Sequence, residues 1–123
     1  LPVDPDASAR RIQARVAAAV GGRVGLIVTD THGRAFRRGL VNVAIGVAGF
    51  APVVDHRGGR DRGGRTLVAT DQALADELAA AAGIYMGKDS GTPAVVASGV
   101  PTRPSPGGVR VLLRARAHDL FRT

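Results

Sequence analysis

The stretch "VGLIVTDTHGRAFRRG", residues 24–39, sets an apolar run directly against polar and basic residues. Nearly continuous apolar character is typical of a strand covered on both faces, so we expect a strand over "RVGLIVTD", residues 23–30. That strand would end on a carboxylate and a hydroxyl, and a glycine-containing basic loop follows at once. An ordinary connection needs neither the acid nor the arginines, so the stretch predicts a site.

Asp30 and Thr31 are the candidate metal ligands. Strand ends hold working groups rigidly while the next loop varies, and hard oxygen atoms suit Mg²⁺ or Mn²⁺. The alternative is that Asp30 caps the turn "DTHGR", and local sequence alone favours this cap slightly. Guanidinium groups hold carboxylates and phosphates, which makes Arg34 and Arg37 candidates for substrate binding, although each can equally be solvated.

The chain opens with helix signals and continues into a second half of similar order. Asp4 or Asp6 can cap a helix that begins with Pro5 and stops at Gly21. Its apolar stripe contains Ile12, Val16 and Val20. The other expected elements are a β run at 38–54 with bulges or close approaches at Gly39, Gly46 and Gly49, a loop or hairpin tip at 55–66, a helix at 70–83, and strands at 94–100 and from 109, joined by a connector at 101–108. We therefore expect one α+β domain over residues 1–123, with a mixed sheet and two main helices.

The second helix carries its own cap and burial signals. Thr70 or Asp71 can cap it, Leu74 and Leu78 mark its buried side, and Gly83 ends it. Asp76 is most simply placed on its solvent face, although a helix carboxylate near the 86–93 loop could also support a phosphate site from behind.

The loop "MGKDSGTP", residues 86–93, is a candidate phosphate cradle. Backbone N–H groups in such a loop can bind phosphate oxygens, and Lys88 adds positive charge. The spacing is not that of a Walker A motif, and the alternative is a turn with Gly87 and Gly91 at positive φ. The candidate nucleotide-binding residues are Met86, Gly87, Lys88, Asp89, Ser90, Gly91, Thr92 and Pro93.

Composition limits the function classes. The 123 residues carry a net charge of +7, all but one of the seventeen basic residues are arginine, and aromatic residues make up 3%. A polyanion partner would explain the charge, but GC-rich coding would too, and the scattered arginines lack the interleaved aromatics of single-strand binders. The chain contains no cysteine, no membrane-length apolar run and no signal-peptide pattern, so we expect a soluble cytoplasmic protein. The three histidines show no zinc-ligand spacing.

Six blocks, taken together and in order, resemble the coenzyme F420-0:L-glutamate ligase family. They are "LPVDPDASA", "VTDTHGRAFRRG", "NVAIGVAGFAPVVDHRG", "DQALADELAAAAGIYMGK", "TPAVVASG" and "LLRARAHDLF", and they span essentially the whole chain. The chain looks like the C-terminal portion of a larger two-lobed ligase module. The family's upstream Asp-x-x-Asn motif does not lie within it, so the resemblance implies that this portion carries part of a site and is incomplete as an enzyme by itself.

The resemblance implies a GTP-dependent ligase that joins L-glutamate to F420-0 through an acyl phosphate and then extends the γ-glutamyl tail. It implies that Asp30 holds a divalent cation, Mg²⁺ or Mn²⁺, and that Thr31 is tied to a second one. It places the nucleotide over residues 86–93 and implies a homodimer, with no nucleic-acid or membrane partner. It assigns no catalytic residue.

Lys88 departs from the family pattern, because some members have a glutamine there that helps to hold the second metal. An ammonium group cannot ligate a cation. Two possibilities stay open: Lys88 contacts a phosphate directly, or the second metal is bound differently. Two other functions also remain as alternatives, a basic nucleic-acid-binding module and a ligase-like assembly domain without catalytic activity.

Overall fold

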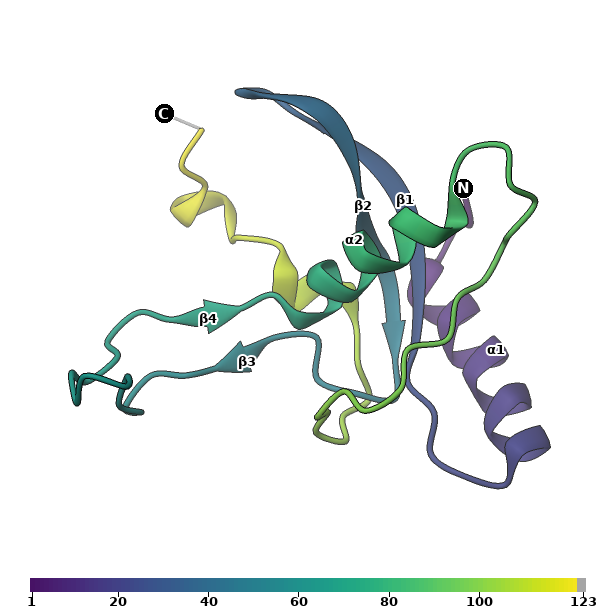
Figure 1. Cartoon of the computed structure of the whole chain (residues 1–123), viewed down its shortest axis with the longest axis horizontal. Coiled ribbons are helices and arrows are strands. Elements are labelled where there is room, and N and C mark those ends of the chain that lie inside the picture. The colour runs from purple at the N-terminus through teal and green to yellow at the C-terminus, as the bar shows by residue number, and fades with distance from the viewer. Residues whose placement is uncertain (122–123) are drawn as a thin grey trace.

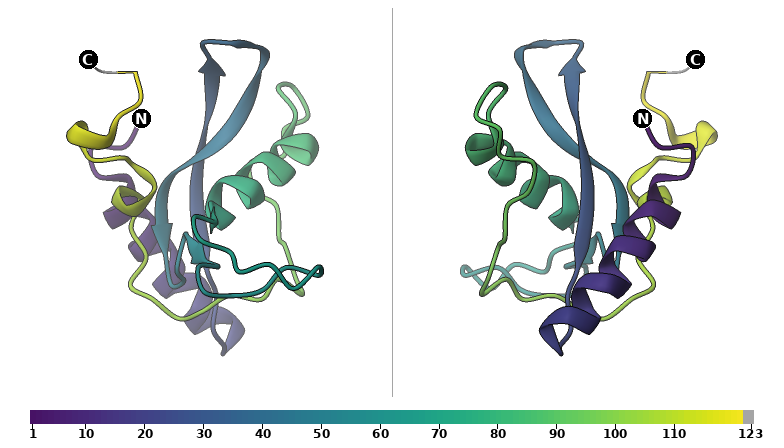
Figure 2. Two further views of the ribbon diagram at one scale, coloured as in Figure 1. Left: turned by 90° about the vertical axis from the view of Figure 1, so that its left-hand side faces the viewer. Right: turned by 90° about the vertical axis from the view of Figure 1, so that its right-hand side faces the viewer.

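The structure is a computed structural model that describes residues 1–121, in which two helices cover the two faces of a long β-hairpin (Figures 1 and 2). The elements are α1 (Pro5–Val20), β1 (Leu26–Arg34), β2 (Arg37–Ala48), β3 (Val54–Asp55), β4 (Asp71–Gln72), α2 (Leu74–Met86) and the short 3-10 helices η1 (Val109–Leu112) and η2 (Arg116–His118). The strands form two antiparallel pairs, β1–β2 and β3–β4. The predicted α+β class with two main helices is confirmed.

The β1–β2 hairpin is the centre of the fold, and one bulge sets its geometry. Val28 pairs with Gly46 while Thr29 pairs with Ala44, so Ile45 is an extra residue on β2. Beside this bulge, a Cβ atom on Gly46 would lie 2.4 Å from the carbonyl oxygen of Pro5. The predicted close approach at Gly46 is confirmed, and it is what allows α1 to lie directly on the hairpin.

Helix α1 begins and ends as its sequence predicts. The Asp4 side chain accepts a hydrogen bond from the Ala7 N–H at 2.8 Å, and Gly21 adopts the left-handed conformation at the C-cap. Asp6, the other candidate cap, instead accepts hydrogen bonds from the backbone N–H groups of Val47 and Val109. It therefore ties α1 to β2 and to the C-terminal segment.

The predicted apolar stripe of α1 is only partly buried. Ala9 is fully buried against the hairpin, but the exposed fractions of Ile12, Val16 and Val20 are 47%, 37% and 62%. The periodicity predicted that the apolar stripe is buried along the whole helix, but the side chains in its C-terminal half remain largely exposed.

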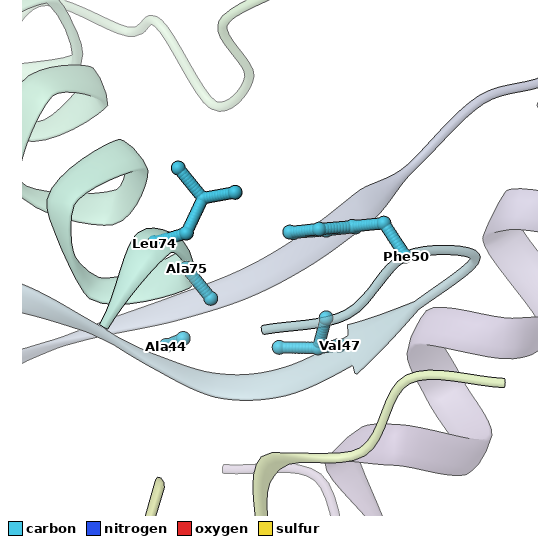
Figure 3. Packing of buried hydrophobic residues seen from close by; sticks show 5 residues of the cluster. All are labelled: Ala44, Val47, Phe50, Leu74 and Ala75. Carbon is cyan, nitrogen blue, oxygen red and sulfur yellow. The ribbon is translucent and has the colours of Figure 1, made fainter. Parts of the chain in front are cut away.

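The core lies between α2 and the hairpin (Figure 3). It consists of Ala44, Val47, Phe50, Leu74 and Ala75, with Ile27, Val54, Leu78, Val100 and Leu112 packed against it. Leu74 and Leu78 are on the buried side of α2, as predicted. Val47 is fully buried and Phe50 is 2% exposed, so the core is small and consists of aliphatic side chains around one aromatic ring.

Helix α2 has different ends from those expected. Asp71 belongs to β4, and the N-cap is Ala73, which has no side-chain capping hydrogen bond, so the predicted cap at Thr70 or Asp71 is wrong. Gly83 does not end the helix, which continues to Met86 and ends at Gly87. The reason is that Gly83 faces β2: a Cβ atom there would lie 3.0 Å from the Asn42 side chain, so the glycine serves close packing.

The segment after α2 contains no strand within residues 94–121, so both strands predicted there are wrong. It runs as an extended chain beside β2, where the Ala51 N–H donates to the Arg103 carbonyl and the Gly108 N–H donates to the Val47 carbonyl. The apolar residues that suggested strands instead supply Val100 and Leu112 to the core.

Residues 55–66 form the tip of a hairpin arm, one of the two forms predicted for them (Figure 1). Beyond the short β3–β4 pair, Arg60 and Thr66 form an isolated bridge, and the Asp61 side chain accepts a hydrogen bond from the Arg65 N–H at 2.8 Å. No helix within residues 1–121 is long and apolar enough to cross a bilayer.

Candidate functional site

The clearest convergence of candidate residues joins β1 to the loop after α2. The ammonium Nζ of Lys88 donates a hydrogen bond to Thr31 Oγ1 at 2.6 Å, although 57 positions separate the two residues. Antiparallel pairing fixes Thr31 on the hairpin, and the end of α2 delivers the loop above it. The structure thus brings together one member of the predicted metal pair and the one lysine of the predicted phosphate loop.

A polar residue that the sequence did not indicate completes this cluster. Asn42 pairs with Thr31 across the hairpin, and Thr31 Oγ1 lies 3.5 Å from Asn42 Oδ1. The Asn42 amide also donates to the sulfur of Met86 at 3.9 Å. Asn42 could have been found only from the register of the hairpin, which the bulge at Ile45 shifts by one residue.

The loop itself is tightly folded. Ser90 Oγ donates to the Met86 carbonyl oxygen and lies 3.3 Å from the N–H of Thr92, which donates to it. Gly87 and Gly91 have φ angles of 60° and 66°, so the turn conformation that the sequence suggested for both glycines is confirmed. Lys88 and Asp89 are exposed, and nucleotide binding by residues 86–93 stays a prediction.

Asp30 lies in a different place from the one the sequence suggested. It pairs with Val43 in the middle of β1, which continues to Arg34, so Asp30 neither ends the strand nor caps a turn. Successive side chains of a strand point to opposite faces, which sets Asp30 on the α1 side and Thr31 on the α2 side. One cation held by both side chains does not fit this geometry, and separate metal roles for the two residues stay predictions.

Asp30 is partly exposed, and no group within residues 1–121 donates a hydrogen bond to its carboxylate. A half-buried carboxylate without a donor suits a cation supplied from outside. The described residues contain no group of three His, Asp or Glu side chains that could hold a metal ion. Asp30 is therefore a candidate anionic ligand, and within residues 1–121 no two further acid or histidine side chains join it to form a metal site.

Arg34 and Arg37 lie at the tip of the β1–β2 hairpin, where they pair with each other. Arg34 Nη2 donates to the carbonyl oxygen of Arg38 at 3.4 Å, and all three residues are exposed. The neighbouring Phe36 ring stacks on Phe121 with centroids 6.1 Å apart, which fixes the tip against the C-terminal segment. Substrate binding by these arginines stays a prediction.

Asp76 is not on the solvent face of α2, which corrects the sequence prediction. Its Oδ1 accepts a hydrogen bond from the backbone N–H of Ala44 at 2.9 Å, next to the bulge on β2. The carboxylate therefore satisfies a backbone group close to the bulge and ties α2 to the hairpin.

The arm contains the clearest electrostatic perturbation. The Arg57 side chain donates hydrogen bonds to the Asp55 carboxylate, its backbone N–H adds another, and together they hold the pKa of Asp55 well below its usual range. The same side-chain hydrogen bond with Asp55 raises the pKa of Arg57. Asp71 lies 3.8 Å from Arg57 as a further acid, so this arginine serves the arm itself.

Comparison with known proteins agrees with the sequence resemblance. Residues 1–99 match the family model described as F420-0:Gamma-glutamyl ligase. The chain belongs to this family.

The relatives that it matches are named coenzyme F420:L-glutamate ligase. The protein of Methanothermobacter thermautotrophicus is 50% identical over 125 residues, which cover 99% of this chain and 50% of the relative. The proteins of Methanopyrus kandleri and Methanocaldococcus jannaschii are 46% and 42% identical, each over 99% of this chain and over 50% and 49% of the relative, respectively. The chain spans about half the length of these curated relatives.

Proposed function

We propose that this chain forms the C-terminal portion of a GTP-dependent ligase that joins L-glutamate to F420-0 and extends the γ-glutamyl tail. Family membership and the names of the relatives support the two substrates. The observation that carries the proposal within the structure is the hydrogen bond from Lys88 to Thr31, which holds the glycine-containing loop 86–93 and its ammonium group over β1.

Amide formation from a carboxylate needs activation, because oxide is not a leaving group. In the proposed reaction a carboxylate oxygen of F420-0 attacks the γ-phosphorus of GTP, the bond to the β-phosphate oxygen breaks, and GDP leaves. The glutamate amine then attacks the carbonyl carbon of the acyl phosphate, inorganic phosphate leaves, and the amine loses a proton. Mg²⁺ or Mn²⁺, when bound, would neutralise negative charge on the phosphates.

The residues of this chain would bind and orient the reactants. Asp30 would supply the carboxylate for a divalent cation, since it is half-buried and has no donor within residues 1–121. The 86–93 loop would hold GTP phosphates through backbone N–H groups and Lys88. Arg34 and Arg37 would bind substrate carboxylates from the exposed hairpin tip. A homodimer is part of the same proposal.

The test uses a protein of the relatives' length that contains this chain, supplied with F420-0, L-glutamate, GTP and Mg²⁺. We expect GDP release and a product heavier by one glutamyl unit, measured by mass spectrometry. Asp30→Ala should abolish turnover, while Asp61→Asn on the distant arm should leave it unchanged. Full activity of a folded Asp30→Ala protein would reject the metal assignment, and no product from the unmutated protein would reject the ligase proposal.

A further inference from the structure

The two side chains that hydrogen-bond with the hydroxyl oxygen of Thr31 within residues 1–121 are Lys88 and Asn42, and neither is a carboxylate. Asn42 offers an amide oxygen, and the C-terminal end of α2, whose last carbonyl groups carry partial negative charge, lies beside them. Asp30, the nearest acid along the strand, belongs to the opposite face. Among residues 1–121 no cluster of three acid or histidine side chains could hold a metal here or elsewhere.

The positive charge that lies at this position is the ammonium group of Lys88. Its hydrogen bond at 2.6 Å uses a lone pair of Thr31 Oγ1, the same electrons that a metal ion would need. The Thr31 proton is then directed toward Asn42 Oδ1. A divalent ion at Thr31 would have to displace the ammonium or lie beside a like charge, and both are unfavourable.

The remaining donors of Lys88 are available. An ammonium group has three N–H donors, Thr31 accepts one, and the side chain is exposed in a loop whose backbone is held by Ser90. Within residues 1–121 no acid forms an ion pair with Lys88. Two donors can therefore point to an anionic ligand above the loop.

We propose that Lys88 is a built-in cation, positioned by Thr31, that takes the place of a divalent ion at this hydroxyl and binds a phosphate oxygen of the nucleotide. The inference rests on the proposed function only for the identity of that nucleotide. It makes Thr31 a positioning residue for Lys88 instead of a metal ligand. Any divalent ion would then bind on the face of the hairpin that carries Asp30.

The first experiment counts Mn²⁺ ions by electron paramagnetic resonance on a protein of the relatives' length that contains this chain, without substrate. We expect Lys88→Gln to bind one Mn²⁺ per chain more than the unmutated protein, because a neutral oxygen donor replaces the ammonium. Thr31→Val in the Lys88→Gln background should remove the additional ion. Arg38→Gln removes the same unit of charge from the exposed hairpin and should leave the number unchanged.

Equal Mn²⁺ numbers for Lys88→Gln and the unmutated protein, with both folded by circular dichroism, would overturn the proposal. So would a Thr31→Val substitution in the otherwise unmutated protein that lowers the number, because Thr31 would then be a ligand already. Neither measurement involves GTP or F420-0. Absence of ligase turnover would reject the proposed function and leave this result standing.

A second experiment measures GTP binding in the presence of EDTA by calorimetry. Lys88→Gln should weaken binding by about 10-fold or more, as expected for loss of a charged hydrogen bond to phosphate. Lys88→Arg should retain most of the affinity, and Thr31→Val should lose part of it because the ammonium is no longer fixed. Unchanged affinity in Lys88→Gln would overturn the phosphate contact.

Discussion

Replacing Asp6 should destabilise the fold far more than its position in the first turn of a surface helix suggests. Asp6 Oδ1 accepts from the Val47 N–H at 2.8 Å and from the Val109 N–H at 3.1 Å, so it joins three segments of the chain. Hydrogen bonds to charged groups contribute about 1.5–3 kcal/mol each, and both N–H groups are partly buried. Allowing for water that enters after the change, we expect Asp6→Ala to cost about 3 kcal/mol, a large share of the roughly 5–15 kcal/mol that stabilises a domain.

Urea unfolding followed by circular dichroism measures this cost. With a slope of about 1.5 kcal/mol per molar, the midpoint for Asp6→Ala should fall by about 2 M. Asp4→Ala is the matched control, because Asp4 accepts a single hydrogen bond from Ala7 and its loss as an N-cap costs about 1 kcal/mol. If the two variants lose equal stability, Asp6 is only a helix-start residue and the reasoning is wrong.

Two further changes test the hairpin and the arm. Gly46→Ala places a Cβ atom 2.4 Å from the Pro5 carbonyl oxygen and should cost about 2 kcal/mol, whereas Gly22→Ala meets nothing within 4 Å and should change the unfolding free energy by less than about 0.5 kcal/mol. The second change is Arg57→Gln, after which the pKa of Asp55, followed by carboxyl-carbon NMR, should rise toward its usual range but stay below it, because the backbone N–H of residue 57 still donates to the carboxylate. Because Arg57 lowers the folded-state pKa, the pair stabilises the arm in full above the unfolded pKa of about 4 and loses that effect as the pH falls below it. An Asp55 pKa that does not change in Arg57→Gln would contradict the side-chain hydrogen bond as the main cause.

Local sequence signals predicted α1 and most of β1. The cap at Asp4, the proline at the first helical position and the left-handed Gly21 fixed α1 at both ends, and the structure confirms them. The apolar run after Val24 predicted β1 correctly except for its length. The strand continues through Asp30 to Arg34 because its partner is β2, and residues of any polarity can pair when a long hairpin supplies the hydrogen bonds.

The errors fall where a distant residue determines the structure. Residues 94–121 have β-like composition, but this segment makes only scattered backbone hydrogen bonds near the end of β2: the Arg103 carbonyl accepts from the Ala51 N–H, and the Gly108 N–H donates to the Val47 carbonyl. No strand forms within residues 94–121. Asn42 joins the candidate site only through the register of the hairpin; Gly46 suggested a bulge or close approach nearby, but it did not show which residue would then face Thr31. Asp76 was expected in water because helix periodicity does not show that a backbone N–H of β2 faces it.

The use of acidic residues gives an independent argument for the importance of Asp30. The chain has only ten acids against seventeen basic residues, and most of the acids make contacts within the fold. Backbone N–H groups donate to Asp4, Asp6, Asp55, Asp61, Asp76 and Asp119. Glu77 accepts a hydrogen bond from Gln72, and Asp71 lies beside Arg57. Within residues 1–121 only Asp30 and Asp89 have no such partner. Asp89 is exposed to water, whereas Asp30 is only partly exposed in the central hairpin. An acid in the central hairpin that makes no hydrogen bond or ion pair within the described residues is consistent with a ligand from outside, and the ligand that a lone carboxylate favours is a cation.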